Sequence, residues 1–396
     1  MLFRDKTIVP SIMFHSVGLE SYPWVWSYVS ESIDSFENKL KLLKHRSFNS
    51  IDWHQLYDYM SGNKLLPLNS IFLTFDDGYL DNWVYVYPLL KKYGFKGTIY
   101  VNPDFVDPRD IVRPNLDDVW MGHVDPEKLS IPGFLSWSEM RIMQESGVID
   151  IQSHSLTHTW YYKGPNIIDY YRSASVQNFP WMAWNYRPDK KPYYLTEDQS
   201  SYVPTGTPIF EHEKSLIVNR FFPDAAAVNK LTVFINERVI KNGNKYNWKI
   251  ILEQQIHTWY NGSVPGSYES NSERLERVHH ELNESKNKIE HNLQKPVDFI
   301  CWPGGGNDSN VWNIARDLGY KSWTLGSQDI STYRNRFQST PEHIKRIGSS
   351  NTVYLLSNNC GKGGALYMLL KIGAHQNSLI YKLFLRLYQI LKYIIK

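Results

Sequence analysis

Cysteine is nearly absent from this chain, and long uncharged apolar runs are absent altogether. Only Cys301 and Cys360 occur among 396 residues, which excludes a disulfide framework, so we expect reduced thiols in a reducing compartment. No uncharged apolar run reaches the roughly 18 residues that a membrane-spanning helix needs. Residues 1–17 lack the apolar region and small-residue cleavage site of a secretory signal. The sequence therefore predicts a cytoplasmic protein.

Acidic residues are absent after Glu342, although the whole chain carries a formal charge of only +3. The basic residues from 361 onward are Lys362, Lys371, Lys382, Arg386, Lys392 and Lys396. They form no distributed stripe along the chain, so a nucleic-acid partner is not expected. The remaining composition, with 42% hydrophobic and 21% charged residues, is that of a globular protein.

The last residues of the chain have the apolar spacing of a helix that begins near Leu379. The apolar positions are Ile380, Leu383, Phe384, Leu387, Ile390, Leu391 and Ile394. A basic amphipathic helix of this kind is typical of one that lies on an anionic membrane. The alternatives are a terminal helix docked on the rest of the fold, or a dimer contact.

Two short motifs carry the chemistry, TFDDG at 74–78 and HSLTH at 154–158. The first follows IFLTF at 71–75, which is typical of a buried strand that stops at a turn. Adjacent strand residues point to opposite sides, so Asp76 and Asp77 do different jobs unless the strand has already ended. Taken alone, such an Asp-Asp-Gly sequence is more often a solvated turn.

The second motif places two histidines four residues apart, after the strand-like pattern VIDIQ. Alone, such a pair is more often surface or core histidine. One turn after His154, however, His158 can return to the same side. Two imidazoles and the carboxylate of one aspartate leave an open coordination position, as catalytic zinc sites do. Both motifs together predict a metal-dependent hydrolase with one carboxylate left over as its base.

The chain at this point resembles the polysaccharide deacetylases, carbohydrate esterase family 4, in which TFDDG and HSLTH look like the first two motifs. The flanking sequences agree over roughly 12–158 and 273–347. The similar segments are IMFHSV (12–17), YPLLKKYGFKGTIYVN (87–102), LSWSEMRIMQESGVIDIQSH (135–154), ELNESKNKIEHNLQKPVDFICWPGGG (281–306) and ARDLGYKSWTL (315–325). The resemblance implies an α/β fold, a distorted and incompletely closed (β/α) barrel.

The resemblance also assigns roles to individual residues. Asp77, His154 and His158 would hold one divalent metal ion, commonly zinc. Asp76 would be the general base that deprotonates the attacking water, and the backbone N–H of Gly304, in CWPGG (301–305), would stabilise the oxyanion. The implied reaction is hydrolysis of an N-acetyl group on a sugar of a glycan. The expected cytoplasmic, membrane-apposed location suggests a lipid-linked or nucleotide-linked sugar, a precursor of a surface polysaccharide, as substrate. Removal of an O-acetyl or formyl group is an alternative.

Two departures from the family pattern put parts of this assignment in doubt. The family's third motif often begins with an arginine that orients the base, and here that position is Cys301. The late Leu-x-His motif, which supplies a general acid, is not evident. His15 and His343 are the candidates for that role. A glycan-binding protein that keeps the fold but has lost turnover is therefore an alternative function.

The stretch from 160 to 268 has no close match to the family and is rich in aromatic residues and prolines. Because aromatic rings stack on the faces of sugars, one interpretation is a substrate-gripping insertion or lid, with Trp181 and Trp184 as its contacts. The other is a small subdomain that uses the rings as its own core. AAAVNKLTVFINERVIKNG (225–243) predicts a helix within it. For Trp302 and Trp323, the walls of an acetyl pocket and aromatic core are equal alternatives.

These observations predict four parts. Residues 1–159 and 269–350 would form the deacetylase barrel, 160–268 the aromatic-rich insertion, and 351–396 a basic amphipathic C-terminal helix region.

Overall fold

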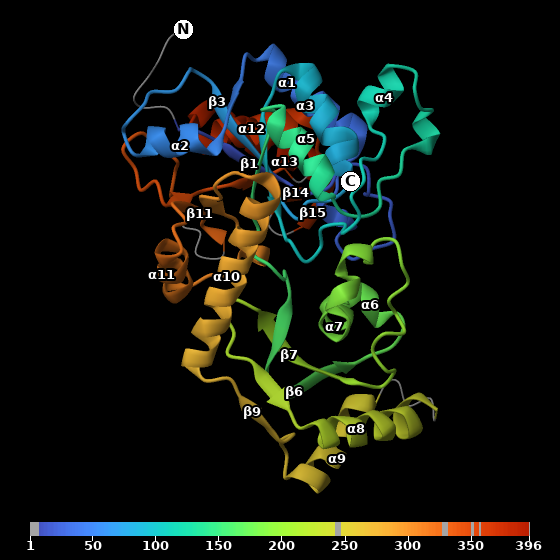
Figure 1. Cartoon of the computed structure of the whole chain (residues 1–396). Helices are drawn as coiled ribbons and strands as arrows, with labels where there is room; N and C mark the ends of the chain where they lie inside the picture. The colour runs from blue at the N-terminus through green and yellow to red at the C-terminus, as the bar shows by residue number, and fades with distance from the viewer. Residues whose placement is uncertain (1–7, 242–246, 327–331, 350–351, 356–357, 396) are drawn as a thin grey trace. The chain divides into compact units, whose positions relative to one another are not determined.

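The computed structural model describes residues 8–241, 247–326, 332–349, 352–355 and 358–395; Lys396 and positions 242–243 of the predicted helix lie outside these ranges. The chain forms two compact units (Figure 1). The first consists of residues 1–156, 285–305 and 319–396, and the second of residues 157–284 and 306–318.

The first unit is built on a nine-stranded sheet in which every described pair of strands is parallel. The strands are β1 (Ser11–Phe14), β2 (Asn49–Ile51), β3 (Ser70–Phe75), β4 (Gly97–Val101), β5 (Ile149–Ser153), β10 (Phe299–Ile300), β11 (Ser322–Thr324), β12 (His343–Ile344) and β13 (Ile347–Gly348). All residues of β3 and β4 are buried. Continuous apolar strands of this kind are expected where helices cover both faces of a parallel sheet.

The order of the strands is that of a barrel that does not quite close. It runs β12-β11-β10-β5-β4-β3-β1-β13, with β2 paired to β3. The two end strands are consecutive in sequence, and only Lys345 and Arg346 separate them. The segment 343–348 therefore pairs with β11 at one end of the sheet and with β1 at the other. The predicted distorted, incompletely closed barrel is confirmed.

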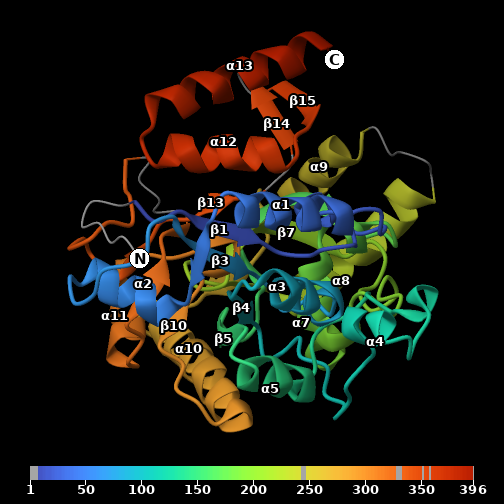
Figure 2. The ribbon, with the colours of Figure 1, turned by 90° about the horizontal axis from the view of Figure 1, so that it is seen from above.

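Helices flank this sheet, and several of them begin at well-formed caps (Figure 2). They are α1 (Ile33–His45), α2 (Trp53–Met60), α3 (Tyr87–Tyr93), α4 (Leu116–Trp120), α5 (Trp137–Glu145) and the part of the long α10 (Asn271–Leu293) from residue 285 onward, which belongs to this unit. Asp52 with Gln55, and Ser136 with Glu139, form capping boxes that start α2 and α5. In the core, Trp53 of α2 stacks on Phe299 of β10 with 4.6 Å between the ring centroids.

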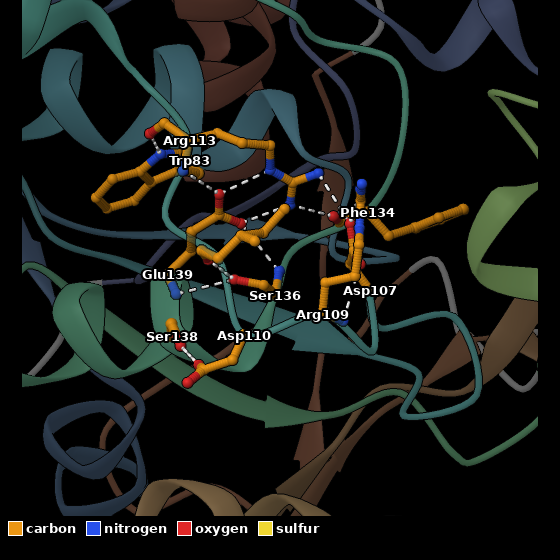
Figure 3. Close-up of polar contacts among 10 residues, drawn as sticks. Trp83, Asp107, Arg109, Asp110, Arg113, Phe134, Ser136, Ser138 and Glu139 are labelled. Carbon is orange, nitrogen blue, oxygen red and sulfur yellow. Dashed lines mark hydrogen bonds and ion pairs between the residues drawn. The ribbon is translucent and has the colours of Figure 1, made fainter.

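Charged side chains fix the segment between β4 and α5 (Figure 3). The Arg113 guanidinium donates to both carboxylate oxygens of Glu139, at 2.8 and 2.7 Å, and to the carbonyl oxygen of Phe134 at 2.8 Å. Glu139 is fully buried. Next to Phe134, the N–H of Leu135 donates to the carbonyl oxygen of Gly78 at 3.0 Å. This network therefore holds the loop that follows β3.

The C-terminal part of the first unit is more than the single helix region that the sequence predicted. It contains the hairpin β14 (Thr352–Leu355) and β15 (Asn358–Lys362), followed by α12 (Ala365–His375) and α13 (Leu379–Ile395). Helix α12 has seven buried residues and packs against α1 (Figure 2). Among the described residues, no helix is long and apolar enough to cross a membrane.

The second unit has a core of its own. Its elements are β6 (Trp160–Tyr170), α6 (Ser175–Asn178), α7 (Pro180–Tyr186), β7 (Pro208–Lys214), β8 (Phe221–Pro223), α8 (Ala225–Phe234), α9 (Trp248–Tyr260), β9 (Gly266–Tyr268) and α11 (Ser309–Asp317). Strands β6 and β7 pair antiparallel, as do β8 and β9. The predicted helix from 225 is α8 and continues as a π-helical turn to Ile240. Tyr170, Phe210 and Phe221 contribute aromatic rings to the core.

Candidate active site

Polar residues directly follow four of the parallel strands. His15 follows β1, Asp76 follows β3, His154 follows β5 and Cys301 follows β10. Because the strands are parallel, their carboxyl ends meet at one edge of the sheet, which is where α/β folds place their functional groups. These four residues are far apart in the sequence, but the fold brings them to the same edge of the sheet.

The backbone of both motifs leaves the conformations that L residues ordinarily adopt. Asp77 has a φ of 77° and Gly78 a φ of 68°. A Cβ on Gly78 would lie 2.9 Å from Cγ1 of Val101, so only glycine fits there. Ser155 and His158 also have positive φ angles, of 60° and 42°. Such conformations cost free energy and persist where the surroundings hold them, commonly at functional sites.

His154 is buried, and its neighbours fix the orientation of the ring. Nδ1 donates to the carbonyl oxygen of Cys301 at 2.8 Å, and Nε2 lies 3.2 Å from Oδ1 of Asp77. The amide of Asn102 donates to the His154 carbonyl oxygen. The same loop continues to His158, and the ligand atoms of Asp77, His154 and His158 all lie within 4.8 Å of one another. The three predicted ligands are together; that they bind metal stays a prediction.

Arg346 is the residue that sequence reasoning missed. Its Nη1 donates to Oδ1 of Asp76 at 2.6 Å and its Nη2 to Oδ2 at 2.9 Å, a two-pronged pair between planar groups. Nη1 also lies 3.2 Å from Oγ1 of Thr74, and Nη2 lies 2.9 Å from Sγ of Cys301. The family often has an arginine at the motif position that is Cys301 here. In this chain Arg346, which lies between β12 and β13, binds Asp76 beside that position instead.

The protonation of Asp76 follows from these contacts. Burial by itself would raise the pKa of Asp76, but the charge of Arg346 and its hydrogen bonds are the main effects that lower it, and the pKa lies below its ordinary value. Burial lowers the pKa of His15 despite the opposing effect of Asp76, whose Oδ2 lies 3.8 Å from Nε2 of His15. Near neutral pH, Asp76 is therefore ionised and His15 neutral.

The sequence contains only a weak signal for Arg346. It stands in the short segment HIKRIG, between the apolar residues Ile344 and Ile347, and this segment is too short to show a regular period. Its partner is set by pairing of Ile347 with Ile12 and of Met13 with Thr74, across two strands of the sheet. This register requires the three-dimensional fold.

A second group of possible metal ligands, Asp76, His154 and Cys301, lies beside the first. Both carboxylate oxygens of Asp76 already accept hydrogen bonds from Arg346, whose Nη2 also contacts the Cys301 sulfur. A cation at this second position would face the guanidinium charge. The Asp77 group therefore suits a divalent ion better.

The remaining predicted residues are more dispersed. Gly304 is exposed and lies in the turn Pro303–Gly305 with a φ of 53°; its oxyanion role stays a prediction. His15 is close to Asp76, as described above. His343 instead begins edge strand β12 and packs 5.6 Å from the Trp323 ring. Of the two candidates for a general acid, the geometry favours His15.

All four tryptophans that were considered as substrate contacts are buried. Trp302 and Trp323 are at most 1% exposed, and Trp181 and Trp184 at most 5%. Trp181 packs on His212 at 4.8 Å, and Trp184 meets Tyr194 edge-on at 5.1 Å. This burial favours the alternative in which the rings form the core; contact with a sugar stays a prediction.

Comparisons with known proteins show which family the chain is similar to. A family model described as polysaccharide deacetylase matches residues 65–177 and 227–323, together more than half of the chain. YxkH of Bacillus subtilis (strain 168), which is named as a polysaccharide deacetylase, is 30% identical over 93 residues, covering 24% of this chain. The matched region spans 31% of that relative.

Two solved structures are similar to the whole arrangement. The deacetylase domain of BpsB from Bordetella bronchiseptica is 17% identical with a TM-score of 0.51, and the match covers 86% of this chain and 96% of that domain. A de-N-acetylase from Aggregatibacter actinomycetemcomitans is 16% identical with a TM-score of 0.48, covering 86% and 94%. At this identity the similarity to the Bordetella domain shows the fold alone.

Proposed function

Because this chain belongs to the polysaccharide deacetylase family, we propose that it is a metal-dependent hydrolase that removes an N-acetyl group from a sugar. The observation that carries the proposal is that two adjacent carboxylates have different partners. Asp77 turns toward His154, whereas Asp76 is held by Arg346. One carboxylate is thereby available as a ligand, and its neighbour remains a charged base.

The donor set fits a catalytic divalent ion such as zinc. It offers one carboxylate and two imidazoles, which leaves a coordination position for substrate. The hydrogen bond from Nδ1 of His154 to the Cys301 carbonyl oxygen is the kind of outer-shell contact that orients a metal-ligating histidine. A divalent ion held by Asp77, His154 and His158 would polarise the acyl carbonyl and acidify water.

The chain's own groups then account for the remaining proton and charge movements. Ionised Asp76 accepts the proton of the attacking water, and Arg346 keeps the carboxylate oriented. The exposed N–H of Gly304 donates to the developing oxyanion. Neutral His15 lies 3.8 Å from Asp76, where it can relay that proton to the leaving amine. The sugar substrate belongs to a polysaccharide or to a glycan precursor, lipid-linked or nucleotide-linked, of a surface polysaccharide.

A glycan-binding protein without turnover is less well supported. The hypothesis arose from the absent motif arginine and the absent late histidine. Arg346 contacts Asp76 through both carboxylate oxygens, and His15 lies beside the same group. Both missing functions therefore have a candidate in this chain.

The test is release of the acyl group by the purified protein. N-acetylated, O-acetylated and N-formylated glycans, together with lipid-linked sugars, are incubated with and without zinc, and free acetate and formate are measured. We expect zinc-dependent acetate release from N-acetylated substrates and its loss after chelation. Binding of glycans without release of either acid from any substrate would contradict the proposal. Release from O-acetylated or formylated substrates alone would mean that the enzyme removes an O-acetyl or a formyl group rather than an N-acetyl group.

A further inference from the structure

Helix α13 presents two apolar faces, and only one of them is covered. Leu385, Tyr388 and Ile390 pack against a buried cluster formed by Val353, Leu355, Cys360 and Tyr367. Tyr388 stacks on Tyr367 of α12 with 5.6 Å between centroids. Figure 2 shows α13 beside α12 and the hairpin of β14 and β15, as the outermost element of this part of the first unit. Ile390, one of the apolar positions of the sequence pattern, is among the docked residues.

The other face is an exposed apolar stripe that runs along the helix. Each of its residues is 44–72% exposed: Ile380, Leu383, Phe384, Leu387, Leu391 and Ile394. At about 100° per residue, these six positions fall within roughly a third of the helix circumference. The helix is about 25 Å long at 1.5 Å per residue. A contiguous exposed patch of this kind marks an interaction surface.

The charges of α13 are all of one sign. Lys382, Arg386 and Lys392 are the charged residues of α13, and no acidic residue occurs anywhere between 343 and 396. Lys382 and Arg386 are exposed. A second copy of α13 offers no acidic residue to pair with these cations, and like charges across an interface are unfavourable. An anionic surface is complementary to both the stripe and its charges.

We propose that the exposed apolar stripe of α13 binds the surface of an anionic lipid bilayer. The helix lies parallel to the surface, with Phe384, Leu387 and Leu391 inserted among the acyl chains and Lys382 and Arg386 against the headgroups. The docked face with Leu385 and Tyr388 keeps the helix attached to the first unit.

The proposal is tested by sedimentation with vesicles of phosphatidylcholine alone or mixed with phosphatidylglycerol. We expect the full chain to sediment with the anionic vesicles and not with the neutral ones, and to bind less in high salt. The double variant Phe384→Gln, Leu387→Gln changes no charge, and its bound fraction should fall at least about fivefold because the inserted apolar area is lost. Lys382→Gln with Arg386→Gln should reduce binding and most of its salt dependence.

A matched control replaces two exposed apolar residues of another segment, Val112→Gln with Met121→Gln. It should bind as the wild type does. Thermal unfolding of every variant checks that the fold is kept. Equal binding to both kinds of vesicle, or unchanged binding of the Phe384→Gln, Leu387→Gln protein, overturns the proposal. The proposal is also overturned if the wild-type protein binds no vesicles but forms a dimer without lipid, and the Phe384→Gln, Leu387→Gln protein is a monomer.

Discussion

Polar side chains are usually exposed and apolar side chains usually buried. The residues that follow the parallel strands (His15, Asp76, His154 and Cys301) and helix α13 depart from this rule in opposite directions. At the strand ends, Asp76 and His154 are nearly fully buried although both are ionisable. On α13, leucine, isoleucine and phenylalanine side chains are exposed although they are apolar. Burying a charge costs free energy unless it is paired, and exposing apolar surface forgoes the main stabilising contribution to folding.

The two departures differ in what compensates them. Asp76 is compensated within the chain, by two hydrogen bonds from Arg346. The described residues leave the stripe of α13 uncovered, and the proposed bilayer would cover it. A buried ionisable group that is paired within the chain thus indicates a catalytic site. An uncovered apolar face indicates a surface that binds a partner.

The largest expected effect is on the base. Asp76→Asn keeps the shape of the side chain and removes the proton acceptor, so turnover should fall by about 10² to 10⁴. Acetate release under substrate saturation measures it. Normal turnover in this variant would mean that another group is the base.

The next effect concerns the ion pair of Arg346 with the buried carboxylate of Asp76. Arg346→Met should lower turnover by about 10- to 100-fold, as loss of an orienting outer-shell group does. Adding Cys301→Arg to this variant places a guanidinium at the position next to Asp76 where the family often has one, and should recover part of the rate. Measuring kcat and KM separately distinguishes this effect from lost substrate binding, which would raise KM and leave kcat unchanged.

A third prediction contrasts a buried ion pair with an exposed one. Arg113→Met leaves the fully buried carboxylate of Glu139 without its main partner and should lower the free energy of unfolding by about 2 kcal/mol. Lys128→Met removes a pair with Asp125 whose side chains are both more than 70% exposed, and should change nothing measurable. Denaturant titration of the two variants decides; equal losses would show that burial does not matter here.

The smallest effect distinguishes the two faces of α13. Leu385→Ala, on the docked face, should cost about 1–2 kcal/mol, because this half-buried side chain loses less than the 2–5 kcal/mol typical of buried leucines. Leu387→Ala, on the stripe, should stay within about 0.5 kcal/mol. Both are measured in the absence of lipid by chemical unfolding. A larger loss at Leu387 would indicate that the stripe is covered within the folded protein.

Much of the fold could be predicted from local pattern. IFLTF and its turn became β3 and the Asp-Asp-Gly loop, and the period of the C-terminal apolar residues gave α13 within its described bounds. The hairpin and α12 were missed because residues 352–375 have neither regular alternation nor a long amphipathic period. The bulges in β6 likewise obscure its alternation.

The candidate site was predictable as far as its residues lie in contiguous motifs. Asp76, Asp77, His154 and His158 each stand in such a motif, and the structure brings them together. Arg346 was not predictable, because its partner depends on how β13 pairs with β1. The burial of Trp302 and Trp323 also depends on packing that spacing along the chain does not contain.

The central claim is that two adjacent aspartates divide the work, with Asp77 as a metal ligand and Asp76 as the base. It is tested most directly by elemental analysis of bound zinc in Asp76→Asn and Asp77→Asn, two isosteric changes one residue apart. The account predicts zinc near wild-type content in the Asp76→Asn protein and loss of zinc from the Asp77→Asn protein. Full zinc in the Asp77→Asn protein, or its loss only from the Asp76→Asn protein, would contradict the division.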